Sequence, residues 1–338
     1  MELYLDSVKI DEVREANKLG FLTGLTTTPT FMLREGITDT DAAILELSKL
    51  VNILHVEALG NDADEIVNEA ERLLGLGLDK NRVVFKIPIS AEGAKACKKL
   101  TDEGIKVNLH LVYTLQQAYF AFCAGATYVC VLVGRLQDQG HDALTLMEQC
   151  VNTVDRYNYS TKIMFSSVRN LEHVRDALNV GSHACTIPWN IFKQLPQNHF
   201  TELGIQQFTD HKDLLTIKAA DLVVTDKVFL KSNATVLDGL MLMTDSKLGA
   251  VIVLDGNNEM YRIFTDGDLR RLVGAGNGEV FRRRFSELET NHPVSIESSA
   301  SLASVIDLFR KKEVDNLVIV ENNKPVGLID IQDILKWI

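Results

Sequence analysis

The sequence lacks any apolar run that approaches the roughly 20 residues a helix needs to cross a bilayer, which argues against a membrane protein. Its start, MELYLDSVKIDEV, has neither the basic nor the apolar segment of a signal peptide, so it gives no prediction of secretion. Positive charge is also scarce, because 35 Lys and Arg stand against 46 Asp and Glu, a formal net charge of −11. General nucleic-acid and membrane-surface binders usually carry a net basic face, so the sequence predicts neither partner.

Cysteine is sparse and irregularly placed. The five cysteines are odd in number and lack the spacing of metal ligands, so we expect reduced thiols, a cytoplasmic protein and no metal site. A G-x-G-x-x-G motif after the first strand is also missing, which weakens a dinucleotide-binding hypothesis.

Up to about residue 200, short apolar runs alternate with amphipathic helical segments. Eight strands each followed by a helix predict a (β/α)8 TIM barrel within residues 1–217, with a doubly wound open sheet as the alternative. The expected strands are ELYLD, TGLTTTP, ILHVEAL, VVFKIPI, VNLHLVY, YVCVLVGR, KIMFSSVR and ACTIP.

Polar residues stand near the ends of these apolar runs. In a barrel, the carboxyl ends of the strands meet at one mouth, where the chemistry of this fold collects. We therefore expect one ring formed by Asp6, Thr27, Glu57, Lys86, His110, Arg135 and Ser167.

Lys86 is the unusual member, because it interrupts the buried-strand sequence VVFKIPIS. A lysine at the end of a buried strand can act as a Schiff-base nucleophile, with Asp6 and Glu57 on suitable strands as acid and base. Arg135 and Arg169 could supply the cations for a phosphorylated substrate. Alternatively, Lys86 extends to the barrel rim and only pairs with Glu57.

The barrel sequence resembles the small transaldolase and fructose-6-phosphate aldolase family of class I aldolases. The motifs that carry this resemblance are MELYLD, GLTTTPT, VVFKIPIS-AEG, AGATYVCVLVGR, FSSVRN and TIP, in that order. The resemblance implies that Lys86 forms the Schiff base, that Asp6 assists proton transfer, and that no cofactor is needed. It also implies that Ser167, Arg135 and Arg169 hold substrate hydroxyls and phosphate, while Glu57 favours the transaldolase branch.

Three positions depart from the family pattern. Thr28 replaces a substrate-binding asparagine in T-T-N-P, and Leu132 replaces an aromatic residue. His110 stands where the family has a threonine that holds the catalytic water. A histidine there could shuttle protons, since its ordinary pKa lies near neutrality, or it could only fill an altered mouth.

From about residue 218 the pattern changes and repeats. AVIVLDGNNEMYRIFTDGDLRRL and NLVIVENNKPVGLIDIQDILKWI share one layout of strand, turn, strand and acidic helix start. We expect a smaller α+β module at 218–338, with copies at about 218–275 and 285–338.

These copies resemble a tandem CBS pair, and IFTDGDLRRL is especially similar to the CBS module of arabinose-5-phosphate isomerases. The resemblance implies an adenine nucleotide as ligand, with Thr265 and Asp268 contacting ribose and Asp333 at the matching place in the second copy. Asp330 stands there in place of a hydroxyl and would repel phosphate. The alternatives are that TDGD only caps a helix and that the pair serves in dimerisation.

These features together predict a Schiff-base transaldolase or aldolase acting on a sugar or sugar phosphate, regulated or assembled by the CBS pair, as a homo-oligomer. The alternatives are an aldolase in the biosynthesis of an unusual sugar and a non-catalytic sensor of a sugar phosphate or nucleotide that uses an altered barrel.

Overall fold

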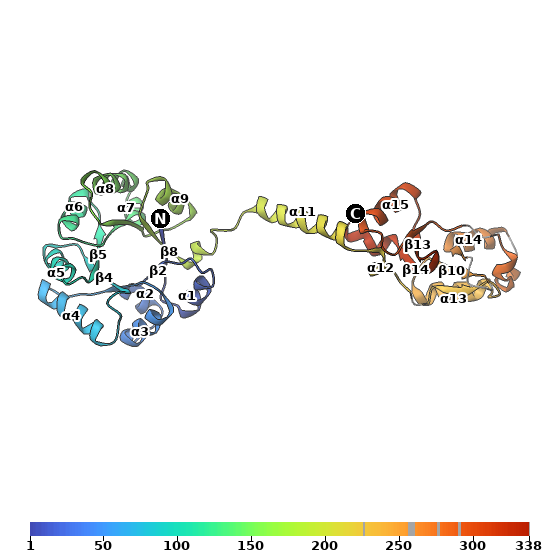
Figure 1. Cartoon of the computed structure of the whole chain (residues 1–338), viewed down its shortest axis with the longest axis horizontal. Helices are drawn as coiled ribbons and strands as arrows, with labels where there is room; N and C mark the ends of the chain where they lie inside the picture. Colours follow the sequence, from blue (N-terminus) through green and yellow to red (C-terminus); the bar gives the residue numbers. More distant parts are fainter. Residues whose placement is uncertain (226, 256–260, 276–277, 290–291, 338) are drawn as a thin grey trace. The chain divides into compact units, whose positions relative to one another are not determined.

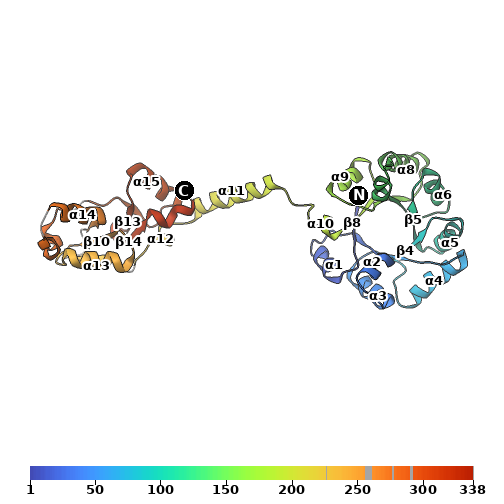
Figure 2. The ribbon, with the colours of Figure 1, turned by 180° about the vertical axis from the view of Figure 1, so that it is seen from behind.

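A computed structural model gives the structure of the chain and describes residues 1–338 except 226, 256–260, 276–277, 290–291 and 338 (Figure 1). The chain forms two compact units, Met1–Gln197 and Asn198–Ile338. Each is described by itself below, and Figure 2 gives the reverse view.

The N-terminal unit is a closed barrel in which β1 to β8 pair in sequence order and β8 pairs with β1. All of these pairings are parallel. The predicted TIM barrel is therefore confirmed. The strands are β1 Glu2–Asp6, β2 Gly24–Thr26, β3 Leu54–Glu57, β4 Val83–Pro88, β5 Lys106–Val112, β6 Tyr128–Leu132, β7 Lys162–Ser166 and β8 Ala184–Pro188.

Helices surround the barrel (Figure 1). Several begin just after a strand because a short polar side chain accepts from the backbone N–H three residues on, as Ser90 does from Gly93 and Asn170 from His173. Their bounds are α1 Ile10–Asn17, α2 Pro29–Arg34, α3 Thr40–Leu50, α4 Ala63–Gly75, α5 Ala91–Asp102, α6 Leu115–Cys123, α7 Val133–Asp138, α8 Ala143–Tyr157, α9 Leu171–Asn179 and α10 Trp189–Phe192.

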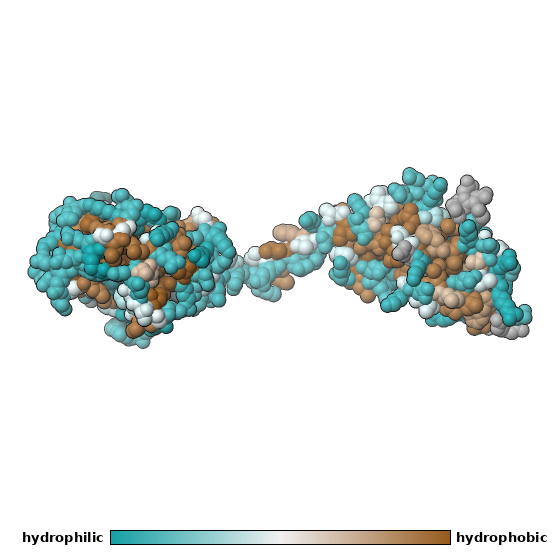
Figure 3. Space-filling view, turned by 90° about the horizontal axis from the view of Figure 1, so that it is seen from below, coloured by the Kyte–Doolittle hydropathy of each residue, from teal (hydrophilic) through white to brown (hydrophobic). Residues whose placement is uncertain are grey.

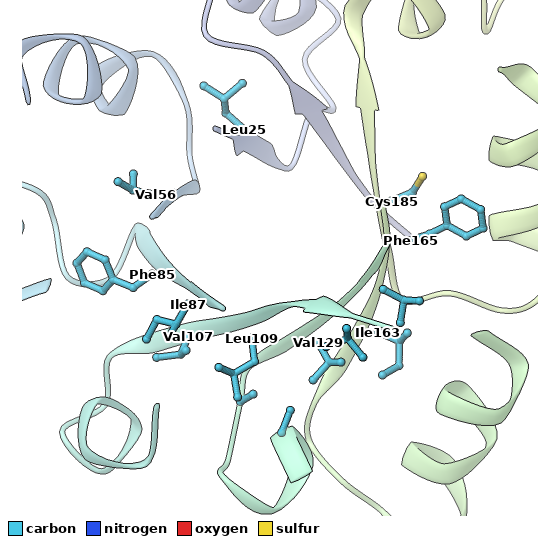
Figure 4. Packing of buried hydrophobic residues seen from close by; sticks show 14 of the residues in the cluster. Leu25, Val56, Phe85, Ile87, Val107, Leu109, Val129, Ile163, Phe165 and Cys185 are labelled. Atoms are coloured by element: carbon cyan, nitrogen blue, oxygen red, sulfur yellow. The ribbon is translucent and has the colours of Figure 1, made fainter. Parts of the chain in front are cut away.

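The strands are buried on both faces. Figure 4 shows Phe85, Ile87 and Phe165 on the outer face, in the layer between strands and helices. Alternate residues point inward, where Val84 belongs to a separate apolar cluster inside the barrel. Lys86 follows the same alternation and so points into the barrel, not toward the helices.

The C-terminal unit contains two three-stranded sheets of matching layout, β11-β10-β9 and β12-β13-β14. In each sheet one strand pair is parallel and the other antiparallel, which confirms the predicted repeat and the smaller mixed-sheet module. The strands are β9 Phe229–Lys231, β10 Ala250–Leu254, β11 Tyr261–Thr265, β12 Ser295–Glu297, β13 Asn316–Glu321 and β14 Lys324–Asp330.

The two sheets share an apolar core, in which Ile252 and Ile263 of one copy join Val318 and Leu328 of the other. The helices are α12 Ala219–Leu222, α13 Val236–Ser246, α14 Asp266–Ala275 and α15 Leu302–Lys312, and the 3-10 segments are Gly278–Arg282, Phe285–Glu287 and Ile331–Trp337.

The boundary between the units differs from the expected one. The barrel was expected to extend to residue 217, but helix α11, His199–Thr216, groups with the C-terminal unit. It lies against α15, and the Trp337 indole Nε1 donates to Asp213 Oδ2 at 3.3 Å. These contacts come from residues more than eighty positions away, so the sequence around residue 217 does not reveal them.

On the face seen in Figure 3, hydrophilic residues surround an apolar centre on the barrel unit, and apolar residues cover a broad area of the C-terminal unit. Among the described residues, no helix is both long enough and apolar enough to span a membrane.

Candidate active site

A cavity of about 780 Å³ lies at the mouth of the barrel. Strand ends and the loops that follow them form its wall, as the fold predicts. Of the residues predicted for the barrel site, those that line this cavity are Asp6, Thr28, Glu57, Lys86, His110, Arg135, Ser167 and Arg169.

Lys86 lies deep in this cavity, with the residue only 5% exposed. Its Nζ donates to the backbone carbonyl of Thr27 at 2.8 Å and lies 2.9 Å from Glu57 Oε1. A buried ammonium is tolerated only where such partners replace water. The side chain therefore does not extend to the rim, although the expected pairing with Glu57 is present.

Glu57 also contacts His110, whose Nε2 lies 2.9 Å from Glu57 Oε2. Both atoms are buried, and among the described residues neither has a hydrogen-bond partner of regular geometry. Burial alone would raise the pKa of Glu57, but the Lys86 charge and the His110 contact outweigh it and lower the pKa below its ordinary value. Burial lowers the pKa of His110 in spite of Glu57, so the geometry favours an ionised carboxylate beside a neutral imidazole.

A bulge in β5 adds Leu111 to the wall beside His110. The pairing of β5 with β6 shifts between Leu109 and Val112, and Leu111 has a left-handed backbone with φ of 58°. As a result, consecutive residues His110 and Leu111 both line the cavity, whereas regular alternation would turn one away.

Asp6 lies at the end of β1, whereas Glu57, Lys86 and His110 come from the consecutive strands β3, β4 and β5. Its Oδ1 accepts from the Thr26 hydroxyl at 2.8 Å. Burial raises the pKa of Asp6 above its ordinary value, against the opposing influence of Lys86 and Thr26. A carboxyl group with a raised pKa is suited to exchanging protons near neutral pH.

The threonines need one correction. Thr27 was predicted to bind substrate, but its hydroxyl donates to the carbonyl of His55 and it does not line the mouth cavity. Strand alternation turns Thr26 inward in its place. Thr28 does line the cavity, and its hydroxyl also caps α2 by accepting from Phe31 N at 3.3 Å.

Cationic side chains stand at the rim. Arg135 and Arg169 are exposed, the first near the Tyr113 hydroxyl at 3.4 Å and the second 3.2 Å from Asp138. Arg34 also lines the cavity, and no sequence pattern pointed to it because it lies on the short helix α2, away from any strand end.

Gly134 lies in α7, directly after β6. In the structure, a Cβ at this position would lie 1.9 Å from the Ser167 carbonyl oxygen. Because Gly134 has no Cβ, the loop that carries Ser167 and Arg169 can pack directly against its backbone. The role of the glycine is therefore to allow this loop its position.

The cavity floor contains residues that the sequence analysis missed, namely Asn108, Cys130 and Met164. The sequence did contain a clue that Asn108 lines the cavity, because it stands two residues before His110 and so lies on the same face of β5. Burial raises the pKa of the Cys130 thiol to about 11, so it stays protonated. Leu132 makes part of this wall apolar.

Metal ligation has no support in the described part of the chain, where no group of three or more His, Cys, Asp or Glu side chains is placed to hold an ion. The cavity offers a lysine, two carboxyl groups and an imidazole, a set suited to covalent and acid–base chemistry.

In the C-terminal unit, Thr265 and Asp268 form a reciprocal cap at the start of α14. The Thr265 hydroxyl donates to Asp268 Oδ2 at 2.8 Å and accepts from Asp268 N at 3.1 Å. The matching Asp330 N donates to Asp333 Oδ2 at 3.1 Å. Burial and the neighbouring Asp333, Asp315 and Asp266 carboxylates raise the pKa of Asp330.

Comparison with known proteins identifies the barrel. The family model described as Transaldolase/Fructose-6-phosphate aldolase matches residues 3–234. The chain belongs to this family. Unlike a single-domain member of the transaldolase/fructose-6-phosphate aldolase family, it also matches the CBS domain model at residues 219–275 and 285–338.

Curated relatives carry the name "Probable transaldolase". One from Thermoanaerobacter sp. is 38% identical over 211 residues, 62% of this chain and 96% of the relative. Another from Coprothermobacter proteolyticus is 38% identical over 208 residues, 62% of this chain and 94% of the relative. A third from Syntrophobacter fumaroxidans is 36% identical over 212 residues, 62% of this chain and 95% of the relative. The chain thus contains nearly the whole length of these family members, followed by the CBS pair.

Proposed function

We propose that the protein is a Schiff-base transaldolase that transfers a ketol unit between sugars through Lys86. The observation that carries this proposal is the position of Lys86: a buried amine at the end of a barrel strand, in contact with a carboxylate that can accept its proton. A lysine that had only a structural role would not need a cavity of about 780 Å³ in front of it.

The first stage is formation of the iminium. Lys86 passes one proton to Glu57, and the free amine adds to the ketone carbon of the donor sugar to give a carbinolamine. Protonation of the carbinolamine hydroxyl releases water, with His110 carrying the proton from Glu57. The ionised Glu57 carboxylate and the neutral His110 imidazole can both accept a proton, and because the pKa of Glu57 is lowered, the protonated carboxyl is transient and passes its proton on.

The second stage breaks the carbon–carbon bond. Asp6 removes the proton of the hydroxyl two carbons from the iminium carbon, an aldehyde leaves, and the bonding electrons move into the iminium to give an enamine. The enamine then attacks an acceptor aldehyde, and water hydrolyses the new iminium. Glu57 favours transfer over simple cleavage, as the resemblance to the transaldolase branch implies.

The substrate class follows from the rim. Arg135 and Arg169 are exposed cations beside the cavity, and guanidinium groups bind phosphate oxygens well. We therefore take a sugar phosphate as the donor, with the phosphate at the rim and the ketone at Lys86.

The CBS pair is proposed to regulate or assemble the enzyme. Thr265 and Asp268 present a hydroxyl and a carboxylate at a helix start, a combination suited to the ribose hydroxyls of an adenine nucleotide. A homo-oligomer formed in the cytoplasm is part of the same proposal, and the free thiols suit a reducing compartment.

Borohydride trapping tests the proposal. The full chain is incubated with ketoses and ketose phosphates, reduced with borohydride and measured by intact mass. Lys86→Ala removes the proposed nucleophile, and Lys99→Ala removes an exposed lysine paired with Asp64 as the matched control. We expect an adduct on the parent and on Lys99→Ala, but none on Lys86→Ala. No adduct on the parent with any ketose would favour a barrel that binds sugars without turnover.

A further inference from the structure

The loop between β7 and α9 carries Ser167 and Arg169, and both residues line the mouth cavity. Ser167 has a left-handed backbone with φ of 61°, a conformation that residues other than glycine adopt at a cost. Such a backbone persists only where the surrounding contacts hold it in place. The conformation of this loop therefore depends on the elements that it packs against.

Helix α7 provides the first set of contacts. The Ser167 carbonyl packs directly against Gly134, and the Arg169 guanidinium lies 3.2 Å from Oδ2 of Asp138, the last residue of the same helix. The pair formed by Arg169 and Asp138 is exposed, and exposed ion pairs contribute little to stability. Helix α7 therefore supports the loop by close packing, while the ion pair adds little to the hold on its backbone.

Helix α9 provides the second contact through His173, in its first turn. The backbone N–H of Arg169 donates to His173 Nδ1 at 3.2 Å, and the backbone N–H of His173 donates to Asn170 Oδ1 at 2.9 Å. His173 is only 7% exposed, and its ring centroid lies 6.0 Å from that of Phe165 on β7. A buried ring thus ties the backbone of the loop to the start of the helix.

The contact requires a neutral imidazole, because Nδ1 can accept a hydrogen bond only when it carries no proton. Burial lowers the pKa of His173 below its ordinary value, in spite of the nearby Asp176 carboxylate. At pH 7 the ring is therefore neutral, with its proton on Nε2 and its acceptor at Nδ1 directed to the Arg169 N–H.

From these contacts we infer that His173 is a positioning residue for the sugar phosphate: by accepting from the Arg169 N–H, it holds the loop in the conformation that keeps Ser167 and Arg169 at the mouth cavity. His173 itself does not line this cavity and takes no part in the proposed proton transfers. The effect on the sugar phosphate rests on the proposed function, whereas the hold on the loop does not depend on it.

The hold on the loop is tested without substrate. Hydrogen exchange of the Arg169 amide, followed by NMR of the ¹⁵N-labelled full chain, reports whether this N–H is bonded. His173→Asn places a side-chain oxygen close to the position of Nδ1, whereas His173→Leu keeps bulk without an acceptor. We expect slow exchange in the parent and in His173→Asn, and exchange about tenfold faster or more in His173→Leu. An Arg169 amide that exchanges equally in all three proteins would overturn the inference.

The effect on the substrate is tested with fructose 6-phosphate and fructose as donors. The measurement is the donor concentration that gives half of the maximal borohydride adduct. We expect His173→Leu to raise this concentration about tenfold or more for fructose 6-phosphate and less than about threefold for fructose. His173→Asn should stay within about threefold of the parent for both donors. The maximal adduct should be the same in all of these proteins, because Lys86 and Glu57 are unchanged.

Asp62→Ala is the matched control, since Asp62 caps α4 by accepting from Glu65 N at 2.9 Å and does not line the mouth cavity. Equal increases for both donors in His173→Leu, or the same selective increase in Asp62→Ala, would mean that His173 serves only the stability of its helix. Absence of adducts on every protein, parent included, would defeat the proposed function and leave the Arg169 amide exchange to decide on His173.

Discussion

Glu57 Oε2 lies 2.9 Å from His110 Nε2, while the other oxygen of the same carboxylate lies 2.9 Å from Lys86 Nζ. One carboxylate thus joins the proposed nucleophile to an imidazole. The position occupied by His110 is, in the family that the sequence resembles, that of a threonine with its catalytic water. The imidazole reaches the carboxylate directly, so proton transfer between the two needs no intervening water.

Replacing His110 should therefore affect turnover more than binding. His110→Ala removes the proton carrier, and we expect kcat to fall about 100-fold or more, the usual scale for a general acid–base. His110→Thr should recover part of this loss, because a hydroxyl can hold a water in the place of the ring. Steady-state kinetics with the donor found by trapping measures both, and His183→Asn, a histidine at the opposite end of the strands, serves as control. An unaltered kcat in His110→Ala would show that the ring only fills space.

Glu57→Gln should impair imine formation as well as turnover. The substitution keeps the shape but removes the carboxylate that accepts the Lys86 proton in the proposed first stage. We expect the yield of borohydride trapping to fall, and transfer to fall about 100-fold. Trapping yield with the donor is the measurement, with Glu69→Gln, a carboxylate in an ion pair with Arg72, as control. A trapping yield equal to that of the parent would show that Glu57 is not the group that accepts the Lys86 proton.

The sequence predicted the barrel because periodicity is local: eight apolar runs, each followed by an amphipathic segment, leave few other folds. It also predicted most of the ionisable residues that line the mouth cavity, since Asp6, Glu57, Lys86 and His110 each stand near the end of a run. Thr27 was wrong by one position, because the inward face of the short strand β2 depends on register with its neighbours, which the sequence does not show.

Other features depended on contacts between distant residues. Asn108 and His55 contact each other only because β3 and β5 place them 3.1 Å apart inside the barrel. Gly134 is explained by the carbonyl of Ser167, and α11 joins the second unit through Trp337. None of these pairs has a local sequence signature, so composition and spacing could not have revealed them.

Gly134→Ala tests the role of Gly134 in placing the phosphate-side residues. A Cβ at 1.9 Å from the Ser167 oxygen must push the loop that holds Ser167 and Arg169 away. We expect KM for a phosphorylated donor to rise about tenfold or more, and KM for the unphosphorylated sugar to change less. Gly75→Ala is the matched control, because nothing lies within 4 Å of its Cβ position. Equal increases in both KM values would argue against a phosphate site at this loop.

Stability should depend on pH through His55. The pKa of His55 in the folded chain lies well below the ordinary value of 6.5. Below pH 6.5, His55 is therefore protonated in the unfolded chain while it is still neutral in the folded chain. The contribution of His55 is therefore complete above pH 6.5 and is lost as the pH falls, by up to about 1.4 kcal/mol per pH unit. We expect the free energy of unfolding of the parent to fall relative to that of His55→Leu between pH 7.5 and 5.5.

Urea unfolding followed by Trp189 fluorescence gives this difference for the barrel, if Trp337→Phe is introduced into both proteins to remove the second of the two tryptophans. Comparing the two proteins cancels the opposite contribution of Asp6, whose pKa is raised in the folded chain. A constant difference across this pH range would mean that His55 titrates normally when folded.

The CBS pair should hold one nucleotide per chain, and the reason is the asymmetry between Thr265 and Asp330. Thr265 offers a hydroxyl beside Asp268, whereas Asp330 places a carboxylate among Asp333, Asp315 and Asp266, which raises its pKa and would repel a phosphate. Asp330→Thr should restore the missing hydroxyl, lower the local negative charge and create a second site. Isothermal titration with AMP, ADP and ATP should give a stoichiometry of one for the parent and two for Asp330→Thr. Thr265→Ala should instead weaken the site of the parent. Two sites in the parent, or one site that survives Thr265→Ala and Asp268→Ala unchanged, would show that the nucleotide is held elsewhere and that the TDGD segment is only a helix cap.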